Sequence, residues 1–99
     1  MQLRYASRDL ERTCTEDRRM QKQLGAQVAK ALRLRIGELI AVQQFDDLLL
    51  GTGRWEQLLG DRAGQWSARL TANWRLIVVQ DADDVVTALI VEITDYHKR

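Results

Sequence analysis

Residues 64–80, GQWSARLTANWRLIVVQ, predict two neighbouring β-strands joined by a tight turn. Apolar and polar residues alternate in the first half, which is typical of a strand with one buried face. Asn73 tolerates turn geometry, and the apolar run that follows it predicts a central strand of the same sheet. Another strand follows at residues 85–95, VVTALIVEITD, after the polar turn DADD. The C-terminal half of the chain is therefore expected to form a small sheet.

The N-terminal half has a different pattern, which predicts mainly helices. Residues 2–5 alternate like a short strand, and a short helix follows with Ser7 as its N-cap. A helical stretch then runs from about residue 16 to residue 43. Gly25 and Gly37 argue against one unbroken helix and leave two helices or a kink as the alternatives. Its apolar side consists of Met20, Leu24, Val28, Ala31, Leu32, Ile36 and Leu39.

Helices followed by strands predict an α+β domain, with N-terminal helices packed on a small, antiparallel-rich twisted sheet. Ninety-nine residues support one core, so residues 1–99 are expected to form a single domain. The residues expected in the core of this sheet include Trp66, Leu70, Val91 and Ile93. No run of eighteen apolar residues is present, which argues against a membrane span.

Charge is unevenly distributed along the chain although the net charge is only +1. Residues 1–45 contain nine Lys and Arg against five Asp and Glu, whereas residues 46–99 contain six against nine. A near-neutral total argues against a strong, purely electrostatic nucleic-acid binder. The helical stretch has a basic side made of Arg19, Lys22, Lys30 and Arg33. This side is either a solvated helix surface or a surface that binds RNA or a partner protein.

Cysteine and histidine are each represented once, by Cys14 and His97. A lone cysteine forms no internal disulfide, which fits a reducing cytosol and a cytoplasmic protein. Without further Cys or His residues a zinc site is not expected. Cys14 is interpreted as a small residue near the start of a helix.

The final strand ends on the sequence Asp95, Tyr96, His97. Strict alternation predicts one side made of Val85, Leu89, Val91, Ile93, Asp95 and His97. Histidine titrates near neutral pH and is a credible proton shuttle, and the neighbouring carboxylate could orient it. The phenol could donate a proton or stack on a base. The alternative is a solvated C-terminus.

Arg75 lies within a run that otherwise forms a core strand. A buried guanidinium is costly unless it is paired or lies at a functional surface, where its fork of donors suits a phosphate. Arg69 on the neighbouring strand could face the same side. Cross-strand pairing of either arginine with Glu92 is the structural alternative, and the sequence leaves both open.

The order GDRAGQWSARLTANWRLIVV, followed by VEITDYH, resembles the RelE superfamily of bacterial toxins, in particular its HigB-type or plasmid-maintenance killer-protein branch. The resemblance covers about residues 54–97. It implies a RelE-like domain that acts as the toxin of a type II toxin–antitoxin system. Such a toxin is a ribosome-dependent endoribonuclease that enters the decoding site of the small subunit, cuts mRNA and inhibits translation. No metal or cofactor is implied.

The partner implied by the resemblance is an antitoxin, usually of the helix-turn-helix type and encoded beside the toxin. The antitoxin neutralises the toxin and binds operator DNA, so that the toxin meets DNA only through it. The catalytic residues implied are Arg75, Asp95, Tyr96 and His97. The RNA-binding residues expected are Asn73 beside them and, as candidate sources of positive charge, the arginines Arg54, Arg62 and Arg69.

One segment departs from the HigB-type pattern. That branch often carries His-Pro-Leu-Lys-Gly-Asp where residues 56–61 here read EQLLGD, so its His and Lys are replaced by Glu56 and Leu59. Weakened or altered activity is therefore expected. The runner-up interpretation is a non-catalytic RelE-fold module that binds the ribosome or an antitoxin-like partner. A third is a plain interaction domain that uses Trp55 and the basic helix side as its contact surface.

Overall fold

The computed structural model describes residues 1–81 and 84–96, and it confirms the predicted α+β architecture. The elements are β1 (Gln2–Tyr5), α1 (Arg8–Thr15), α2 (Asp17–Leu24), α3 (Ala26–Ala41), the 3-10 helix η1 (Phe45–Leu50), β2 (Glu56–Gln57), the 3-10 helix η2 (Gly60–Arg62), β3 (Gln65–Arg69), β4 (Trp74–Asp81) and β5 (Asp84–Asp95).

The five strands form one sheet in the order β1-β5-β4-β3-β2. Strands β2 to β5 pair antiparallel in succession, and β1 joins β5 in parallel at the far edge. The predicted hairpin is confirmed, because Arg69 lies opposite Arg75 in the register and the Leu70 amide donates to the Trp74 carbonyl at 2.9 Å. The parallel β1–β5 pair requires a long connection, and every other element of the fold, from α1 to β4, lies within it.

The helices begin and end where local chemistry favours it. Ser7 caps α1, because its hydroxyl accepts a hydrogen bond from the Leu10 amide at 3.1 Å. The long helical stretch breaks at Gly25, whose φ of 84° suits glycine and separates α2 from α3. Gly37 stays inside α3 without a break. Of the alternatives that the sequence left open, the structure therefore has two helices, with the break at the first glycine.

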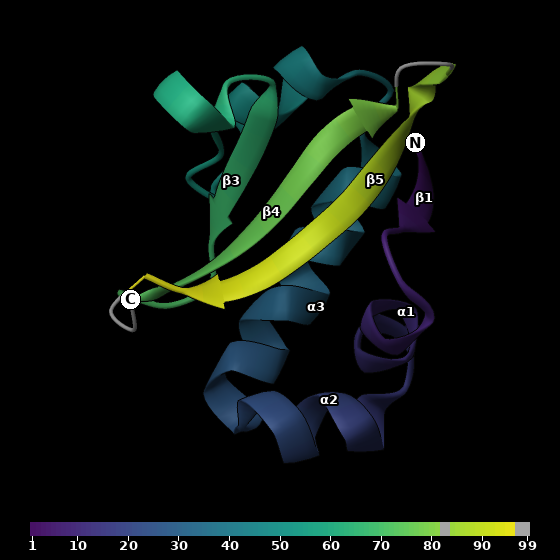
Figure 1. Ribbon diagram of the computed structural model, residues 1–99, viewed down its shortest axis with the longest axis vertical. Coiled ribbons are helices and arrows are strands. Elements are labelled where there is room, and N and C mark those ends of the chain that lie inside the picture. The colour runs from purple at the N-terminus through teal and green to yellow at the C-terminus, as the bar shows by residue number, and fades with distance from the viewer. Residues whose placement is uncertain (82–83, 97–99) are drawn as a thin grey trace.

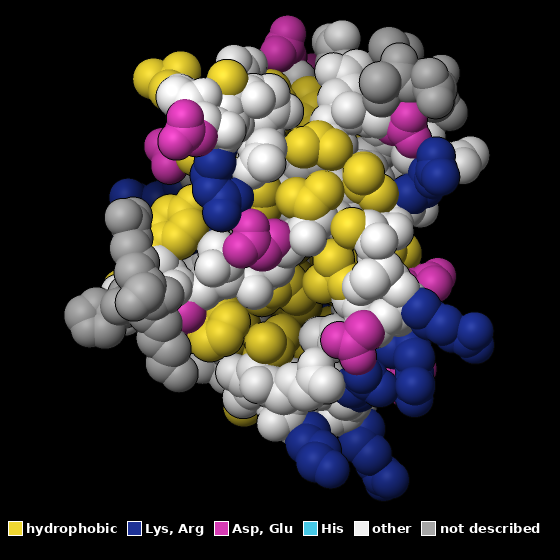
Figure 2. All heavy atoms as spheres, viewed as in Figure 1, with side chains coloured by type: hydrophobic (Ala, Val, Ile, Leu, Met, Phe, Trp, Pro, Cys, Tyr) yellow, Lys and Arg dark blue, Asp and Glu magenta, His cyan; other side chains and the backbone are white. Residues whose placement is uncertain are grey.

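Helices α1, α2 and α3 lie on one face of the sheet, and within the described residues no α-helix covers the other (Figure 1). The helix-covered face holds the hydrophobic core, whose fully buried members include Met20, Leu32, Leu39, Leu76, Val78 and Ile90. Trp66 and Leu70 are buried there as predicted. Figure 2 looks onto the opposite face, called the open face here, and shows an apolar area surrounded by charged side chains.

The predicted alternation along β5 is wrong, and so is the placement of Val91 in the core. The register shifts between Ile77 and Val78, which lie opposite Glu92 and Ile90, so Val91 has no partner on β4. Such a bulge changes the phase of the alternation. Ile90 and Ile93 consequently both pack on the core, whereas Val91 is half-buried and lies outside it.

Candidate functional site

The hairpin end of the open face carries a row of polar residues. Ala68, Leu76 and Ile93 lie side by side on the covered face, so the next cross-strand row lies on the open face. That row consists of Arg69, Arg75 and Thr94. Two arginines directly opposite one another repel, and an anion placed between them would relieve that repulsion.

Neither arginine of this row pairs with Glu92, so the structural alternative is wrong. The Glu92 carboxylate instead accepts a hydrogen bond from Arg62 at 3.1 Å, and Arg62 also donates to the Gln65 side chain at 2.8 Å. Within the described residues no ion pair joins Arg69 or Arg75 to a carboxylate.

Arg75 is held in place by the turn that precedes it. Its Nη1 donates to the backbone carbonyls of Thr71 at 2.8 Å, Ala72 at 3.2 Å and Trp74 at 2.9 Å. The guanidinium carbon also lies 5.2 Å from the centre of the Tyr96 ring, a cation–π distance. These contacts use one nitrogen and one face of the guanidinium. Its remaining nitrogens carry further N–H donors.

The turn and the C-terminal end of β5 are tied together. The Tyr96 amide donates to the Asn73 carbonyl at 2.8 Å, which places the two predicted residues side by side. His97, the predicted proton shuttle, lies outside the described residues. Arg75, Asn73 and Tyr96, three of the predicted site residues, therefore lie together.

Three of the predicted arginines converge on one hollow of about 270 Å³, called the arginine hollow here. Its lining consists of Arg54, Trp55, Glu56, Arg69 and Arg75. Glu56 is the one carboxylate in that lining, and it was not predicted as a site residue. Strand β2 pairs Glu56 with Ser67, two residues before Arg69 on β3. A two-residue strand gives too little pattern for the sequence to reveal that pairing.

A second hollow of about 460 Å³, the terminal hollow, lies between η2 and the end of β5. Leu59, Arg62, Asp95 and Tyr96 are among its lining residues. The predicted site is thus divided between two hollows, and the stacking of Arg75 on Tyr96 joins them. Leu59 is 85% exposed, so the position where the HigB-type branch carries lysine lies on the surface.

Trp55 is not a contact surface, which makes that part of the third interpretation wrong. The side chain is only 6% exposed, and its indole N–H donates to Glu38 at 2.7 Å. Trp55 instead lines the arginine hollow and joins it to helix α3.

The basic helix side is spread over separate helices. Arg19 pairs with Asp9, and Arg33 lies 3.8 Å from Asp17, whereas Lys22 is exposed. Dark-blue side chains gather at the lower right of Figure 2, over α1 and α2. A hollow of about 490 Å³ there is lined by Arg12, Glu16, Arg18, Arg19, Lys22 and Gln23.

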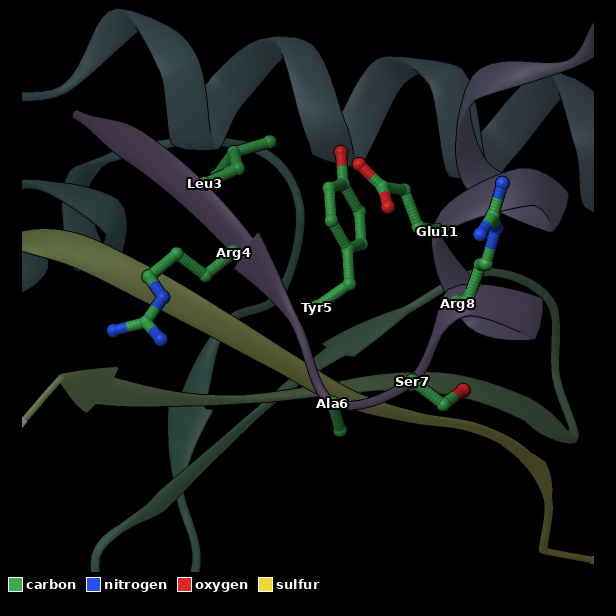
Figure 3. A pocket seen from close by; sticks show the side chains of 7 residues that line it. All are labelled: Leu3, Arg4, Tyr5, Ala6, Ser7, Arg8 and Glu11. Carbon is green, nitrogen blue, oxygen red and sulfur yellow. The ribbon is translucent and has the colours of Figure 1, made fainter.

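A further hollow of about 600 Å³ lies at the junction of β1 and α1 (Figure 3). The Tyr5 hydroxyl and the Glu11 carboxylate point toward each other there. Burial, assisted by the negative charges that Cys14 and Glu11 carry when ionised, raises the pKa of Tyr5. Strand β1 and strand β2 form opposite edges of the sheet, so this hollow is separate from the arginine hollow.

Other classes of site find little support in the described residues. No group of three His, Cys, Asp or Glu side chains gathers there as a metal site would require. Burial raises the pKa of the Cys14 thiol to about 11, which leaves it protonated and inert near neutral pH. In the same part of the chain, no helix has both the length and the apolar composition needed to cross a bilayer.

The sequence matches the model of one known protein family. The family model described as "YoeB-like toxin of bacterial type II toxin-antitoxin system" matches residues 6–97. None of the curated proteins matches the chain significantly in sequence. The HigB-type branch stays a prediction, because the matching family is the YoeB-like one.

Solved structures of similar fold include a YoeB/ParE toxin from Agrobacterium tumefaciens, with 22% identity and a TM-score of 0.66 over 96% of this chain and 98% of that one. A YoeB–YefM complex from Staphylococcus aureus matches at 21% identity and a TM-score of 0.57, over 95% and 94% of the two chains. A YafQ variant from E. coli matches at 13% identity and a TM-score of 0.60, over 96% and 92%. At these identities the likeness establishes the fold, which the sequence predicted.

Proposed function

The chain belongs to the YoeB-like toxins of bacterial type II toxin–antitoxin systems, and from that membership we propose that it is a ribosome-dependent endoribonuclease. It inhibits translation by cutting mRNA in the decoding site of the small subunit. The observation that carries the proposal is the convergence of Arg54, Arg69 and Arg75 with Glu56 in one hollow. The HigB-type assignment within the toxins rests on the sequence resemblance alone.

Cleavage of RNA suits this set of side chains because RNA carries its own nucleophile, the 2′-hydroxyl. The protein needs to accept the hydroxyl proton, stabilise the charge on the phosphorane and protonate the leaving 5′-oxygen. Each proton transfer typically contributes about 10²–10⁴-fold, and a preorganised charge on the phosphorane contributes on a similar scale. No metal ion is required for these steps.

The arginines are assigned to the phosphate. Arg69 and Arg75 face each other across β3 and β4, so a phosphate between them replaces repulsion by two attractive contacts. Arg54 adds a third guanidinium from the same hollow. Arg75 is the principal phosphate ligand, because the turn carbonyls and Tyr96 fix its guanidinium before substrate arrives.

The proton-transfer groups are proposed to be Glu56 and Tyr96, which lie around the arginines, and His97, which the sequence resemblance supplies. Glu56 is the carboxylate in the arginine hollow and is proposed to accept the 2′-hydroxyl proton. Tyr96 and His97 are proposed to deliver a proton to the leaving oxygen, with Asp95 orienting the histidine. In this scheme Glu56 takes the role of the histidine that the HigB-type pattern carries and this chain lacks.

The partners proposed are an antitoxin and the ribosome. A fold relative has been solved as a YoeB–YefM complex, which supports an antitoxin partner for this chain. The antitoxin is proposed to be of the helix-turn-helix type and to carry all contact with DNA. The basic area over α1 and α2 is proposed to meet ribosomal RNA phosphates in the cytoplasm.

The runner-up remains a non-catalytic module that blocks the ribosome or binds an antitoxin-like partner. The observation that favours it is the exposed Leu59 in place of a lysine on the rim of the terminal hollow. Such a module would arrest translation without producing new mRNA ends.

Induction in bacteria tests the proposal. Wild-type protein is expected to halt growth and translation and to generate new mRNA 5′ ends, whereas Arg75→Ala and His97→Ala relieve all three effects. Arg4→Ala is the matched control, because Arg4 is an exposed arginine paired with Asp81 at the far side of the sheet. Arrest without new mRNA ends would favour the non-catalytic module. Normal growth at good soluble expression would overturn both interpretations.

A further inference from the structure

A polar cluster connects Trp55, a lining residue of the arginine hollow, to helix α3 and has no part in the chemistry proposed above. Arg35 and Glu38 of α3 form an ion pair, with Nη1 at 3.2 and 3.0 Å from the two carboxylate oxygens. The Trp55 indole N–H donates to the same carboxylate at 2.7 Å. The two charged side chains are only 13% and 26% exposed. These three residues are called the α3 clamp.

The clamp leaves no room at the neighbouring residue, Gly53. A Cβ built there would overlap side-chain atoms of Arg35, Glu38 and Trp55. On its other side, the Gly53 carbonyl accepts a hydrogen bond from the Arg69 amide at 3.1 Å. Gly53 is buried. The segment is therefore wedged between helix α3 and strand β3.

The next residue, Arg54, has an unfavourable backbone conformation. Its φ of 52° makes it the single non-glycine residue with positive φ in the described part of the chain. For a residue with a Cβ, this left-handed region costs about 1–2 kcal/mol. Such strain persists only where the surroundings impose it. Here Gly53 is fixed on one side and Trp55 on the other, and β2 begins immediately afterwards at Glu56.

The imposed conformation has a consequence for the site. Arg54 lies between two anchored neighbours, and its side chain lines the arginine hollow with Arg69 and Arg75. A relaxed, negative φ would turn the Cα–Cβ bond of Arg54 and move the guanidinium away. Arg35 takes part indirectly, because it binds both oxygens of Glu38 and so fixes the carboxylate that receives the indole N–H.

We propose that Glu38 and Trp55 are positioning residues that hold Arg54 in its left-handed conformation and so place its guanidinium beside Arg69 and Arg75. Their role in cleavage rests on the proposed function. Their role in setting the Arg54 backbone does not. The competing explanation is that the clamp only stabilises the fold.

Trp55→Phe is the most direct variant, since it removes the N–H donor, keeps an aromatic ring, and leaves Glu38 paired with Arg35. Single-turnover cleavage at saturating ribosome concentration is expected to slow about 10- to 100-fold, the scale of a small misplacement of a reacting group. The ribosome concentration for half-maximal rate should change little, because the area proposed to contact the ribosome lies over α1 and α2, away from Trp55. Trp66→Phe is the matched control, since Trp66 is equally buried but packs on Phe45 at the helix-covered face.

Substitutions at Glu38 separate positioning from stability. Glu38→Gln retains a carbonyl oxygen that accepts the indole N–H and is expected to keep most of the cleavage rate. Glu38→Leu removes the acceptor and is expected to lose rate as Trp55→Phe does. Cleavage at the wild-type rate by folded Trp55→Phe would overturn the proposal. Equal losses of rate in Trp55→Phe and Trp66→Phe, in proportion to lost stability, would overturn it as well.

An NMR measurement tests the clamp without any activity. A residue with positive φ gives a strong intraresidue NOE between its amide and α protons. That signal is expected for Arg54 in the wild type and in Glu38→Gln, and it should be lost in Trp55→Phe and Glu38→Leu. Retention of the signal in all four proteins would overturn the positioning role. A wild type that gives the signal but cleaves nothing would contradict the proposed function and leave the clamp standing.

Discussion

The two faces of the sheet differ sharply, although their residues alternate along the same strands. On β4, Leu76 is fully buried under the helices, and its neighbour Arg75 lies in the polar row of the open face. The covered face contains the core, and the open face contains the arginines, Glu56 and the end of β5. Single-residue steps along a strand therefore separate the core from the face that carries the proposed chemistry, so substitutions on the two faces should have separable effects.

The largest expected difference is in stability, between Leu76→Ala and Arg69→Ala. Truncation of the fully buried leucine should lower the free energy of unfolding by about 2–5 kcal/mol, because it removes buried methyl groups and leaves a cavity. Arg69→Ala removes an exposed charge opposite Arg75, and its effect should lie within about 0.5 kcal/mol of zero. Urea unfolding of the three proteins measures both values. Equal losses would contradict the separation of the two faces.

A smaller effect concerns the pH dependence of the covered side. Burial raises the pKa of Cys14 from its ordinary value of 9.0 to about 11 in the folded protein. Below pH 9 the thiol is neutral in both states, and it makes no pH-dependent contribution. Between about pH 9 and 11 the unfolded chain releases this proton and the folded chain keeps it, so the free energy of unfolding falls. The fall amounts to about 2–3 kcal/mol, at about 1.4 kcal/mol per pKa unit.

Cys14→Ala should remove that part of the alkaline loss. Urea unfolding at pH 8, 9.5 and 11 compares the variant with the wild type. Tyr5→Phe separates out the other alkaline contribution. The pKa of Tyr5 is also raised, so its phenol lowers the free energy of unfolding in the same direction at higher pH. Identical pH profiles for wild type and Cys14→Ala would show that the thiol ionises as readily in the folded protein as in the unfolded chain.

The smallest expected effect on stability is that of Leu59→Lys on the rim of the terminal hollow. The side chain is 85% exposed, so the free energy of unfolding should change by less than about 0.5 kcal/mol. A cation beside Asp95 and Tyr96 should raise mRNA cleavage in a translating extract by a few-fold. Leu50→Lys is the matched control, because Leu50 is also highly exposed but lines neither hollow. Unchanged cleavage in both folded variants would show that a lysine at residue 59 is not needed.

The sequence predicts the parts of the fold that depend on local pattern. Alternation, turn chemistry and helical spacing are local, and they correctly place the β3–β4 hairpin and the Ser7 cap and include Gly25 among the two candidate breaks. The bulge beside Val91 is not local, because it depends on how β5 registers against β4. The alternation predicted for β5 therefore fails beyond that point.

The candidate site shows the same limit. Arg75 is recognisable in the sequence because a charged residue interrupts an apolar run. Glu56 is not, because its neighbours in the arginine hollow come from three separate segments. The hydrogen bond between Trp55 and Glu38 joins a loop residue to helix α3, which is a tertiary contact. The sequence does not reveal that contact, so it allowed Trp55 to be interpreted as an exposed contact residue, whereas the side chain is buried.

The central claim is that the open face cuts mRNA only on the ribosome. The net charge is +1, and three arginines at one hollow neutralise few phosphates, so free RNA should bind weakly at physiological salt. The most direct measurement is one gel that compares cleavage of the same message at the same protein concentration, with and without programmed ribosomes. Cleavage in the ribosome lane, with none of naked mRNA, is the predicted result. Equal cleavage in both lanes would contradict the claim, because the protein would then position RNA with its own surface.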